Sequence, residues 1–310
     1  MELIGSLIAK FRKVSEFFAK DRVWSLRACG LVITLIIILI SGISGWLIER
    51  LALTNSPITK SIGSTILVIS MASTLASKSL RTSVLNVLEA IPKNHHDDED
   101  LQDAQKQLSK IVGRDVWQLK RAEIIRASAE TASENSIDGV FAPLFWLFIG
   151  AALWNISPNL PGPLSLALVF KSSSTIDSML GYRVGRLRWL GTAGAKLDDI
   201  LTWIPCRAVL LTLPLISQPI YKFPALVKAA WVDGSKDISP NSGLSEAIFA
   251  HCAEVRMGGG NWYKGQLIQK PIIAKDAATA DINSVEEILR LSFRLEVTWL
   301  VVIAAISYSI

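Results

Sequence analysis

The chain has 310 residues, of which 50% are hydrophobic and 19% are charged. An average soluble domain carries about 25% charged residues, and the charges here are clustered, which leaves long stretches without any. This pattern excludes an ordinary soluble domain, and the apolar content excludes a disordered chain. The composition therefore predicts an integral membrane protein in which polar loops connect apolar segments.

The net charge of +5 arises from 32 basic and 27 acidic residues. Basic residues between apolar segments usually set the orientation of a membrane protein, and the chain contains no basic run of five or more. We therefore expect a lipid bilayer, and no nucleic acid, as a partner. The three cysteines lack the spacing of a metal or redox site, so we expect neither a disulfide framework nor a zinc site.

Two apolar segments in the first quarter of the chain are predicted to cross the membrane. Residues 29–48 form the clearest transmembrane segment, because this run, at about 1.5 Å per residue, covers the roughly 30 Å hydrocarbon core. Residues 62–77 are less apolar, and their small side chains suit packing between helices more than contact with lipid.

Three later apolar segments are harder to assign. Residues 139–155 and 164–170 predict a hairpin around a Pro/Gly turn, and its second arm either extends past residue 170 or is re-entrant. Residues 208–221 are short and contain two prolines, which predicts a re-entrant or interfacial segment as readily as a span. Residues 297–310 predict either a final span or a helix packed on the others.

The distribution of basic residues predicts the orientation of the polar loops. Under the positive-inside rule, the N-terminus and the loops at 78–138, 171–207 and 222–294 lie in the cytoplasm. We therefore predict an all-α, polytopic integral membrane protein with about four or five membrane segments and helical cytoplasmic loops. Residues 1–310 would form a single integral membrane domain, whose three loops make the candidate active face.

Residues 121–146 contain the sharpest candidate for a chemical site. Glu130, Glu134 and Asp138 are four residues apart, so a helix places them on one face. Stacked carboxylates repel each other unless a positive group lies between them, and Mg²⁺ with phosphate oxygens would supply one. A solvated helix face neutralised by Arg126 and nearby lysines explains the same pattern.

Two further segments contain candidate binding residues. Residues 172–207 carry acids beside arginines, which suits a phosphorylated substrate with a metal and equally suits salt bridges. Residues 237–266 begin with a Ser-Pro-Asn-Ser-Gly turn ahead of a predicted helix, whose first amides are free to meet an anion. The glycine-rich run at 258–265 is by itself more often a turn than a binding loop.

Together these segments resemble the CbiB/CobD family of cobalamin biosynthesis, the adenosylcobinamide-phosphate synthases. The resemblance covers roughly residues 60–290, and the motifs agree in order and spacing. The matching strings are IVGRD (111–115), AETASENSIDGVFAPLFW (129–146), TIDSMLGY (175–182), AKLDD (195–199), IPCR (204–207), SPNSG (239–243) and GGNWYKG (259–265).

The resemblance implies a multi-pass protein of the inner membrane. It implies a carbon–nitrogen ligase that joins aminopropanol, or aminopropanol phosphate, to a side-chain carboxylate of adenosylcobyric acid. Such amide formation is driven by ATP, and Mg²⁺ neutralises the transferring phosphoryl group. Other membrane enzymes of the same pathway are the partners that it implies.

The matching motifs contain the candidate site residues, to which we assign roles by residue type. The catalytic candidates that would bind Mg·ATP are Glu130, Glu134, Asn135, Asp138, Asp177, Asp198 and Asp199. The candidates for binding phosphate or substrate are Arg114, Arg183, Lys196, Arg207, Ser239, Asn241, Gly259, Gly260 and Tyr263. The predicted Mg²⁺ ligands are Glu134, Asp138 and Asp198.

The chain departs from the family pattern in a few places. It begins near the point where the family's opening Gly-Asp-Pro to His-Pro-Val stretch would end, which predicts either a start that is placed too late or a lost helix. Ser174 and Cys206 replace the usual Asn and Ala, and both changes keep the neighbouring acids and arginines.

Other classes of protein explain parts of the same sequence. A non-enzymatic membrane subunit of a corrinoid transport complex requires polar groups inside its spans, whereas here the charges lie in the loops. A prenyltransferase-like enzyme requires paired acidic motifs of the DxxxD type, which Glu130, Glu134 and Asp138 only imitate. An inactive truncated homologue would explain the short N-terminus.

Overall fold

The structure is a computed structural model that describes residues 2–92, 100–182 and 184–309. Its elements are mostly helical, which confirms the predicted class, and one small sheet adds to it. The clearest apolar run, residues 29–48, lies within the longest helix, α2 (Val23–Ala52).

The chain divides into two compact units, each built from two stretches of sequence. The first unit comprises residues 1–75 and 142–202, and the second comprises residues 76–141 and 203–310. The first unit contains α1 (Glu2–Ala19), α2 (Val23–Ala52), α3 (Pro57–Thr74), α7 (Ala142–Ile156), α8 (Pro163–Leu180), α9 (Leu187–Leu190) and the beginning of α10 (Thr192–Ser217).

The second unit contains the end of α10 together with shorter helices and all the strands. Its other elements are α4 (Ser77–Glu89), α5 (Gln102–Leu108), α6 (Arg121–Ser136), the π-helix η1 (Ile137–Phe141), the 3₁₀-helix η2 (Ile220–Lys222), α11 (Phe223–Gly234), α12 (Ser242–Cys252), β1 (Val255–Tyr263), β2 (Gln266–Ile273), β3 (Ala278–Thr279) and α13 (Ile282–Ser309).

Four helical stretches of the described residues are long and apolar enough to cross a membrane. They are Val23–Ala52, Pro57–Glu89, Arg121–Ile156 and Thr192–Ser217. The third stretch begins in α6, passes through η1 and ends in α7. The acidic motif and the apolar segment that follows it are therefore parts of one continuous helix, as the sequence predicts.

Other predicted segments have different boundaries in the structure. Residues 208–217 end the 26-residue helix α10, which is a candidate span, so of the two alternatives for 208–221 the structure favours the span. Of the two prolines in that stretch, Pro214 lies inside the helix, where neighbouring groups can satisfy the freed backbone, and Pro219 follows it. Much of the predicted loop at 171–207 accordingly belongs to α8 and α10.

The structure also gives the bounds of the second arm of the predicted hairpin and of the C-terminal helix. The arm extends past residue 170, because α8 continues to Leu180. The C-terminal helix α13 is 28 residues long and packs against α6 and α4. It is not among the four candidate spans found in the described residues.

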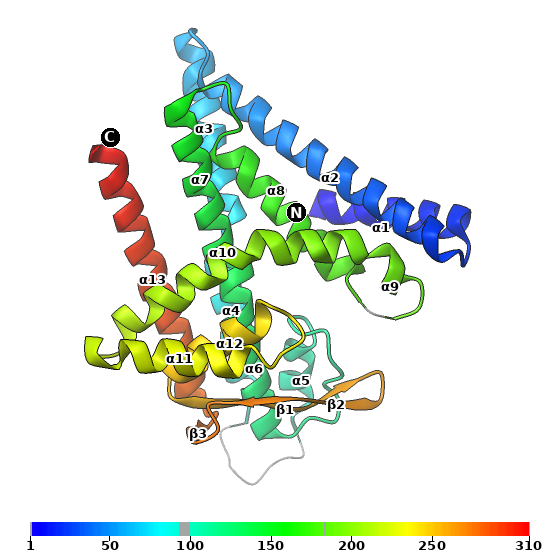
Figure 1. Ribbon diagram of the computed structural model, residues 1–310, viewed down its shortest axis with the longest axis vertical. Helices are drawn as coiled ribbons and strands as arrows, with labels where there is room; N and C mark the ends of the chain where they lie inside the picture. The colour runs from blue at the N-terminus through cyan, green and yellow to red at the C-terminus, as the bar shows by residue number, and fades with distance from the viewer. Residues whose placement is uncertain (1, 93–99, 183, 310) are drawn as a thin grey trace. The chain divides into compact units, whose positions relative to one another are not determined.

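A buried carboxylate joins two helices of the first unit. In this unit α2, α3, α7 and α8 pack on one another (Figure 1). Glu49 of α2 is fully buried and accepts hydrogen bonds from the backbone N–H groups of Gly162 at 3.0 Å and Ser165 at 2.9 Å. These amides open α8, so Glu49 satisfies donors that every helix N-terminus leaves free.

A three-stranded sheet forms one side of the second unit. Strand β1 pairs antiparallel with β2 and parallel with the short β3. The hairpin of β1 and β2 contacts α12, and β1 also contacts α6 (Figure 1). Residues 258–263 lie inside β1, which corrects the expectation that the glycine-rich run at 258–265 is a turn.

Replacing Glu49 should destabilise the first unit. We expect Glu49→Ala to leave two buried amides without acceptors and to lower the free energy of unfolding by about 1–3 kcal/mol for each. The melting temperature of the protein in detergent, followed by circular dichroism, measures this loss. Glu89→Ala is the matched control, because Glu89 is exposed on α4. Equal melting temperatures for both variants would contradict the role of Glu49.

Candidate active site

Glu130 of α6 lies at the centre of a buried ionic cluster in the second unit. Its side chain is 1% exposed. Its Oε2 accepts a hydrogen bond from Arg114 Nη2 at 2.6 Å, and its Oε1 accepts from Arg126 Nη1 and from the amide of Gly258, each at 2.9 Å. Two guanidinium groups thus compensate a charge that would be costly to bury alone. A solvated acidic face is therefore excluded at Glu130.

Arg126 connects α6 to strand β1. Its guanidinium donates to the carbonyl oxygens of Gly258 at 2.7 Å and Gly260 at 2.8 Å, and to Asn261 Oδ1 at 3.3 Å. Arg114 donates to the same oxygen of Asn261. Asn261 is buried, so the two arginines hold the strand by polar groups that water does not reach.

The glycines of β1 are required by its backbone. Gly258 and Gly259 have φ angles of 84° and 98°, a region that residues with a side chain rarely adopt. A side chain at Gly258 would also overlap the carbonyl oxygen of Pro271 in β2. The pairing with β2 shifts between Met257 and Gly259, so the glycine-rich run forms a bulged strand.

A second group of charged side chains lies around Lys270 of β2. Its Nζ donates to Glu246 Oε1 of α12 at 3.1 Å and lies 3.7 Å from Asp237 Oδ2. Glu134 follows Glu130 by one turn of α6, and the charges of Lys270 and Asp237 act on its carboxylate. Three carboxylates therefore share one ammonium group.

The crowding of carboxylates around Lys270 explains the shifted pKa values of Glu246 and Lys270. Burial, together with the negative charges of Glu130 and Glu134, raises the pKa of Glu246 to about 8. Burial also works against the charge of Lys270, but the carboxylates of Glu246, Glu134 and Asp237 raise its pKa above the usual value. Lys270 keeps its charge, so Glu246 is the member of the pair that changes protonation near neutral pH.

Arg207 of α10 occupies a second polar region of the same unit. Its Nη1 donates to Asn241 Oδ1 at 2.7 Å, and its Nη2 donates to the carbonyl oxygen of Pro240 at 3.0 Å. The guanidinium lies 4.4 Å from the ring centroid of Trp203. Ser239 Oγ accepts the amide hydrogen of Asn241 at 3.3 Å. Three predicted binding residues thus meet at the Ser-Pro-Asn turn.

Asp138 departs from the predicted acidic stripe. It lies in the π-helix η1, whose wider turns interrupt the four-residue spacing of Glu130 and Glu134. Its charge acts on Cys206 of α10, the neighbour of Arg207 in the sequence. Single π-helical turns are frequent at functional sites. That Asp138 shares a site with Glu130 and Glu134 stays a prediction.

The remaining predicted residues of the second unit lie beside these groups. Asn135 follows Glu134 in α6, and Tyr263 ends β1. Gly259 and Gly260 belong to the bulged part of β1. Their proximity to the Glu130 cluster follows from the strand, because Arg126 holds the carbonyl oxygen of Gly260.

Other predicted residues lie in the first unit. They are Asp177, Lys196, Asp198 and Asp199. Gly194 permits α10 to approach Ile176 of α8, because a side chain at Gly194 would overlap it. In the sequence, Asp177 follows Ile176 and Asp198 comes four residues after Gly194. Arg183 lies outside the described residues. A single site that unites the acids of both units stays a prediction.

The predicted metal site is not preformed in the described residues. Within them, no three His, Cys, Asp or Glu side chains form a group that could hold a metal ion. Mg²⁺ needs only one or two carboxylates when substrate phosphates complete its shell. The crowded acids around Lys270 fit that requirement, since the buried Oε2 of Glu246 has no described hydrogen-bond partner. Glu134 and Asp138 lie in the second unit and Asp198 in the first, so their joint coordination stays a prediction.

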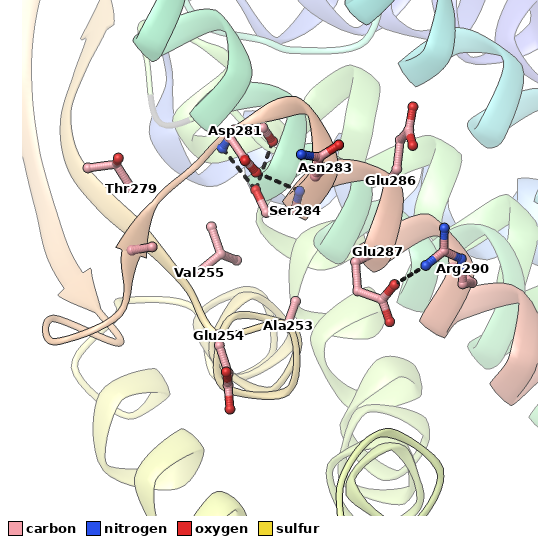
Figure 2. Close-up of a pocket in the computed structure, with 11 residues that line it drawn as sticks. Ala253, Glu254, Val255, Thr279, Asp281, Asn283, Ser284, Glu286, Glu287 and Arg290 are labelled. Atoms are coloured by element: carbon pink, nitrogen blue, oxygen red, sulfur yellow. Dashed lines mark hydrogen bonds and ion pairs between the residues drawn. The ribbon is translucent and has the colours of Figure 1, made fainter.

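A cavity of about 530 Å³ lies beside the first turn of α13 (Figure 2). It contains none of the predicted residues. Several of its polar groups already have partners: Asp281 and Ser284 bond reciprocally through their backbone N–H groups, and Glu287 pairs with Arg290 at 2.6 Å. The reciprocal bonds form a helix cap, so this cavity is not part of the candidate site.

Four residues of the ionic groups around Glu130 and Lys270 lie outside the predicted set. They are Arg126, Asp237, Glu246 and Lys270. Glu246 is the one charged residue of the stretch GLSEAIFA, and a lone acid among apolar helical residues signals a buried ion pair. Lys270 gives no such signal, because only the hairpin of β1 and β2 brings it to a partner 24 residues away.

The fold and the cluster define a helical membrane-type protein with a buried ionic site. The profile of the CobD/CbiB proteins matches residues 1–292. The chain therefore belongs to the CobD/CbiB family of cobalamin biosynthesis proteins, which confirms the resemblance seen in its motifs. No solved structure matches the chain.

Relatives from distant bacteria share most of its length. The chain is 37% identical to the cobalamin biosynthesis protein CobD of Synechocystis sp., over 88% of this chain and 75% of that protein. It is 31% identical to CobD of Clostridium acetobutylicum, over 96% of this chain and 88% of that protein. It is 34% identical to CbiB of Salmonella typhimurium, over 70% and 63%.

Removing the central carboxylate should unfold the second unit more easily. We expect Glu130→Ala to leave Arg114 and Arg126 as uncompensated buried charges and to lower the free energy of unfolding by about 3–5 kcal/mol. Denaturant titration of the protein in detergent measures this change. The control Glu123→Ala removes an acid from the surface of the same helix and should cost about 1 kcal/mol or less. Losses of equal size would contradict the central role of Glu130.

Proposed function

We propose that this protein is an ATP-dependent carbon–nitrogen ligase of cobalamin biosynthesis. It joins aminopropanol or aminopropanol phosphate to a carboxylate of adenosylcobyric acid, which gives adenosylcobinamide or its phosphate. The observation that carries the proposal is the buried ionic cluster of the second unit, in a chain whose family acts in this pathway. Buried, unevenly compensated charges are typical of sites that handle charged substrates.

The chemistry requires two steps. A carboxylate oxygen of adenosylcobyric acid attacks the terminal phosphorus of ATP, which gives an acyl phosphate and releases ADP. The amine nitrogen then attacks the acyl carbon, phosphate leaves with the C–O bond electrons, and the nitrogen loses a proton. The sum forms one amide for each ATP converted to ADP and phosphate.

The residues of the second unit suit the first step by their charge. Mg²⁺, when bound, would neutralise the charge of the transferring phosphoryl group. Glu134 and the acids around Lys270 are the candidate ligands, and Lys270 itself offers a positive group to phosphate oxygens. Glu130 has another task, because both of its oxygens already have partners. It positions Arg114 and the glycine-rich strand β1 around the substrates.

The four apolar helices support a site at a membrane surface. We place the protein in the inner membrane, and we place on the cytoplasmic side, where ATP is available, those parts of residues 78–138, 171–207 and 222–294 that lie outside the candidate spans. Basic residues in those stretches favour this orientation. Other membrane enzymes of the pathway are the partners we expect there.

A mass spectrum of the corrinoid product tests the activity. Purified protein in detergent receives adenosylcobyric acid, ATP, Mg²⁺ and either aminopropanol or its phosphate. We expect a mass gain equal to the amine minus one water, and no gain when ATP is omitted. Failure with both amines would contradict the ligase and favour a non-enzymatic role in handling corrinoids.

Variants then test the assigned acids. We expect Glu134→Ala and Asp198→Ala to lower turnover by about a hundredfold or more, the scale of losing a group that stabilises charge in the transition state. Glu123→Ala, in the same helix as Glu134, should keep full turnover. Membrane extraction and gel filtration check that all variants insert and fold alike. Full activity of both test variants would rule out the proposed Mg·ATP site.

A further inference from the structure

A small cavity in the second unit lies between the Ser-Pro-Asn turn and α11. Its volume is about 300 Å³, and its lining includes Arg207, Trp231, Asp237 and Ser239. The approach of the surrounding segments depends on Gly243, because a side chain there would overlap Asp237. The cavity therefore has a fixed wall with a cation and an anion in it.

Arg207 lines this cavity, and described hydrogen bonds satisfy its guanidinium only in part. Its described hydrogen bonds employ Nη1, toward Asn241 Oδ1 and the carbonyl oxygen of Trp203, and one N–H of Nη2, toward Pro240. Its Nε has no hydrogen-bond partner among the described residues. That Nε is buried, so Arg207 offers an oxyanion the charge of its guanidinium and the remaining N–H of Nη2.

Two indole rings keep the guanidinium in place. Its central carbon lies 4.4 Å from the ring centroid of Trp203 and 5.8 Å from that of Trp231. Stacking on aromatic rings is a property of the planar guanidinium that lysine does not reproduce. The guanidinium of Arg207 is thus held in place before any ligand arrives.

Asp237 supplies the opposite charge. Its Oδ1 accepts the amide hydrogen of Ser239 at 3.0 Å. Its Oδ2 lies 3.7 Å from Lys270 Nζ, and that ammonium group bonds more closely to Glu246 at 3.1 Å. Lys270 is therefore the closer partner of Glu246, and Asp237, which lines the cavity, offers a carboxylate to a cation bound there. Asp237 also joins the cavity to the ionic cluster around Glu130.

We propose that this cavity is the site of the amine substrate, a small molecule with an oxyanion at one end and an ammonium group at the other. Arg207 holds the oxyanion, and Asp237 holds the ammonium group. The inference rests on the proposed ligase activity. The volume lies at the lower end of the range for ligand pockets, about 300–1,000 Å³, so it suits a small amino alcohol phosphate and not a corrin ring.

The arrangement orients the ligand for reaction. With its oxyanion on Arg207, the amine lies on the side of Asp237, which contacts Lys270 of the ionic cluster. An amine bound there is held on the side where we place the activated carboxylate. A ligand bound in the opposite orientation would place its oxyanion next to Asp237. The repulsion between these two negative groups disfavours that orientation.

Equilibrium binding to the full-length protein in detergent tests the site without ATP or corrinoid. The probes are aminopropanol phosphate, aminopropanol and inorganic phosphate. We expect Arg207→Lys to weaken aminopropanol phosphate and inorganic phosphate by about tenfold or more, the scale of a lost charge-assisted hydrogen bond, with aminopropanol little changed. Asp237→Asn should weaken aminopropanol phosphate and aminopropanol and leave inorganic phosphate unchanged. Arg290→Lys, in the cavity of Figure 2, is the control and should bind all probes normally.

The outcomes separate this inference from the ligase itself. If the wild-type protein ligates but both site variants bind aminopropanol phosphate normally, the site is overturned and the activity stands. If the variants behave as expected but no product forms in the ligation assay, the site stands and the ligase is overturned. If Arg207→Lys does not fold, Trp231→Leu replaces it, and unchanged binding of phosphate by that variant and of amine by Asp237→Asn also overturns the site.

Discussion

The burial of one carboxylate governs the second unit. A charge at the position of Glu130 is tolerated only if positive groups and hydrogen-bond donors surround it. Arg114, Arg126 and the amide of Gly258 meet that demand from three different parts of the chain. Satisfying one acid therefore sets the place of the loop before α6 and of the bulged strand β1.

Each of the two units contains a buried carboxylate, and the two carboxylates have different roles. In the first unit Glu49 meets backbone amides at the start of α8, so its charge serves the packing of apolar helices. In the second unit the arginines that neutralise Glu130 also reach the strand β1, and further acids crowd around Lys270. The first arrangement is complete in itself, whereas the second leaves the buried Oε2 of Glu246 without a described partner.

The candidate site has two connected parts with different chemistry. The cluster around Glu130 and Lys270 suits the highly charged reactants of phosphoryl transfer, while the cavity at Arg207 suits a small ion of mixed charge. Asp237 belongs to both, because it lines the cavity and faces Lys270. Such a division would let one part activate the acid while the other orients the amine, which is how positioning contributes to rate.

The amino-acid sequence by itself determined the membrane class, the helical fold and the family. Long apolar runs and acidic motifs are local signals, and they were sufficient to select Glu130, Glu134 and Arg207. Only the tertiary structure decided that both carboxylate oxygens of Glu130 pair with arginines, that residues 258–263 form a strand, and that Glu246 and Lys270 form an ion pair. The reason is that burial and pairing depend on contacts between distant segments: a hairpin of β1 and β2 has to form before Lys270 meets Glu246 of α12.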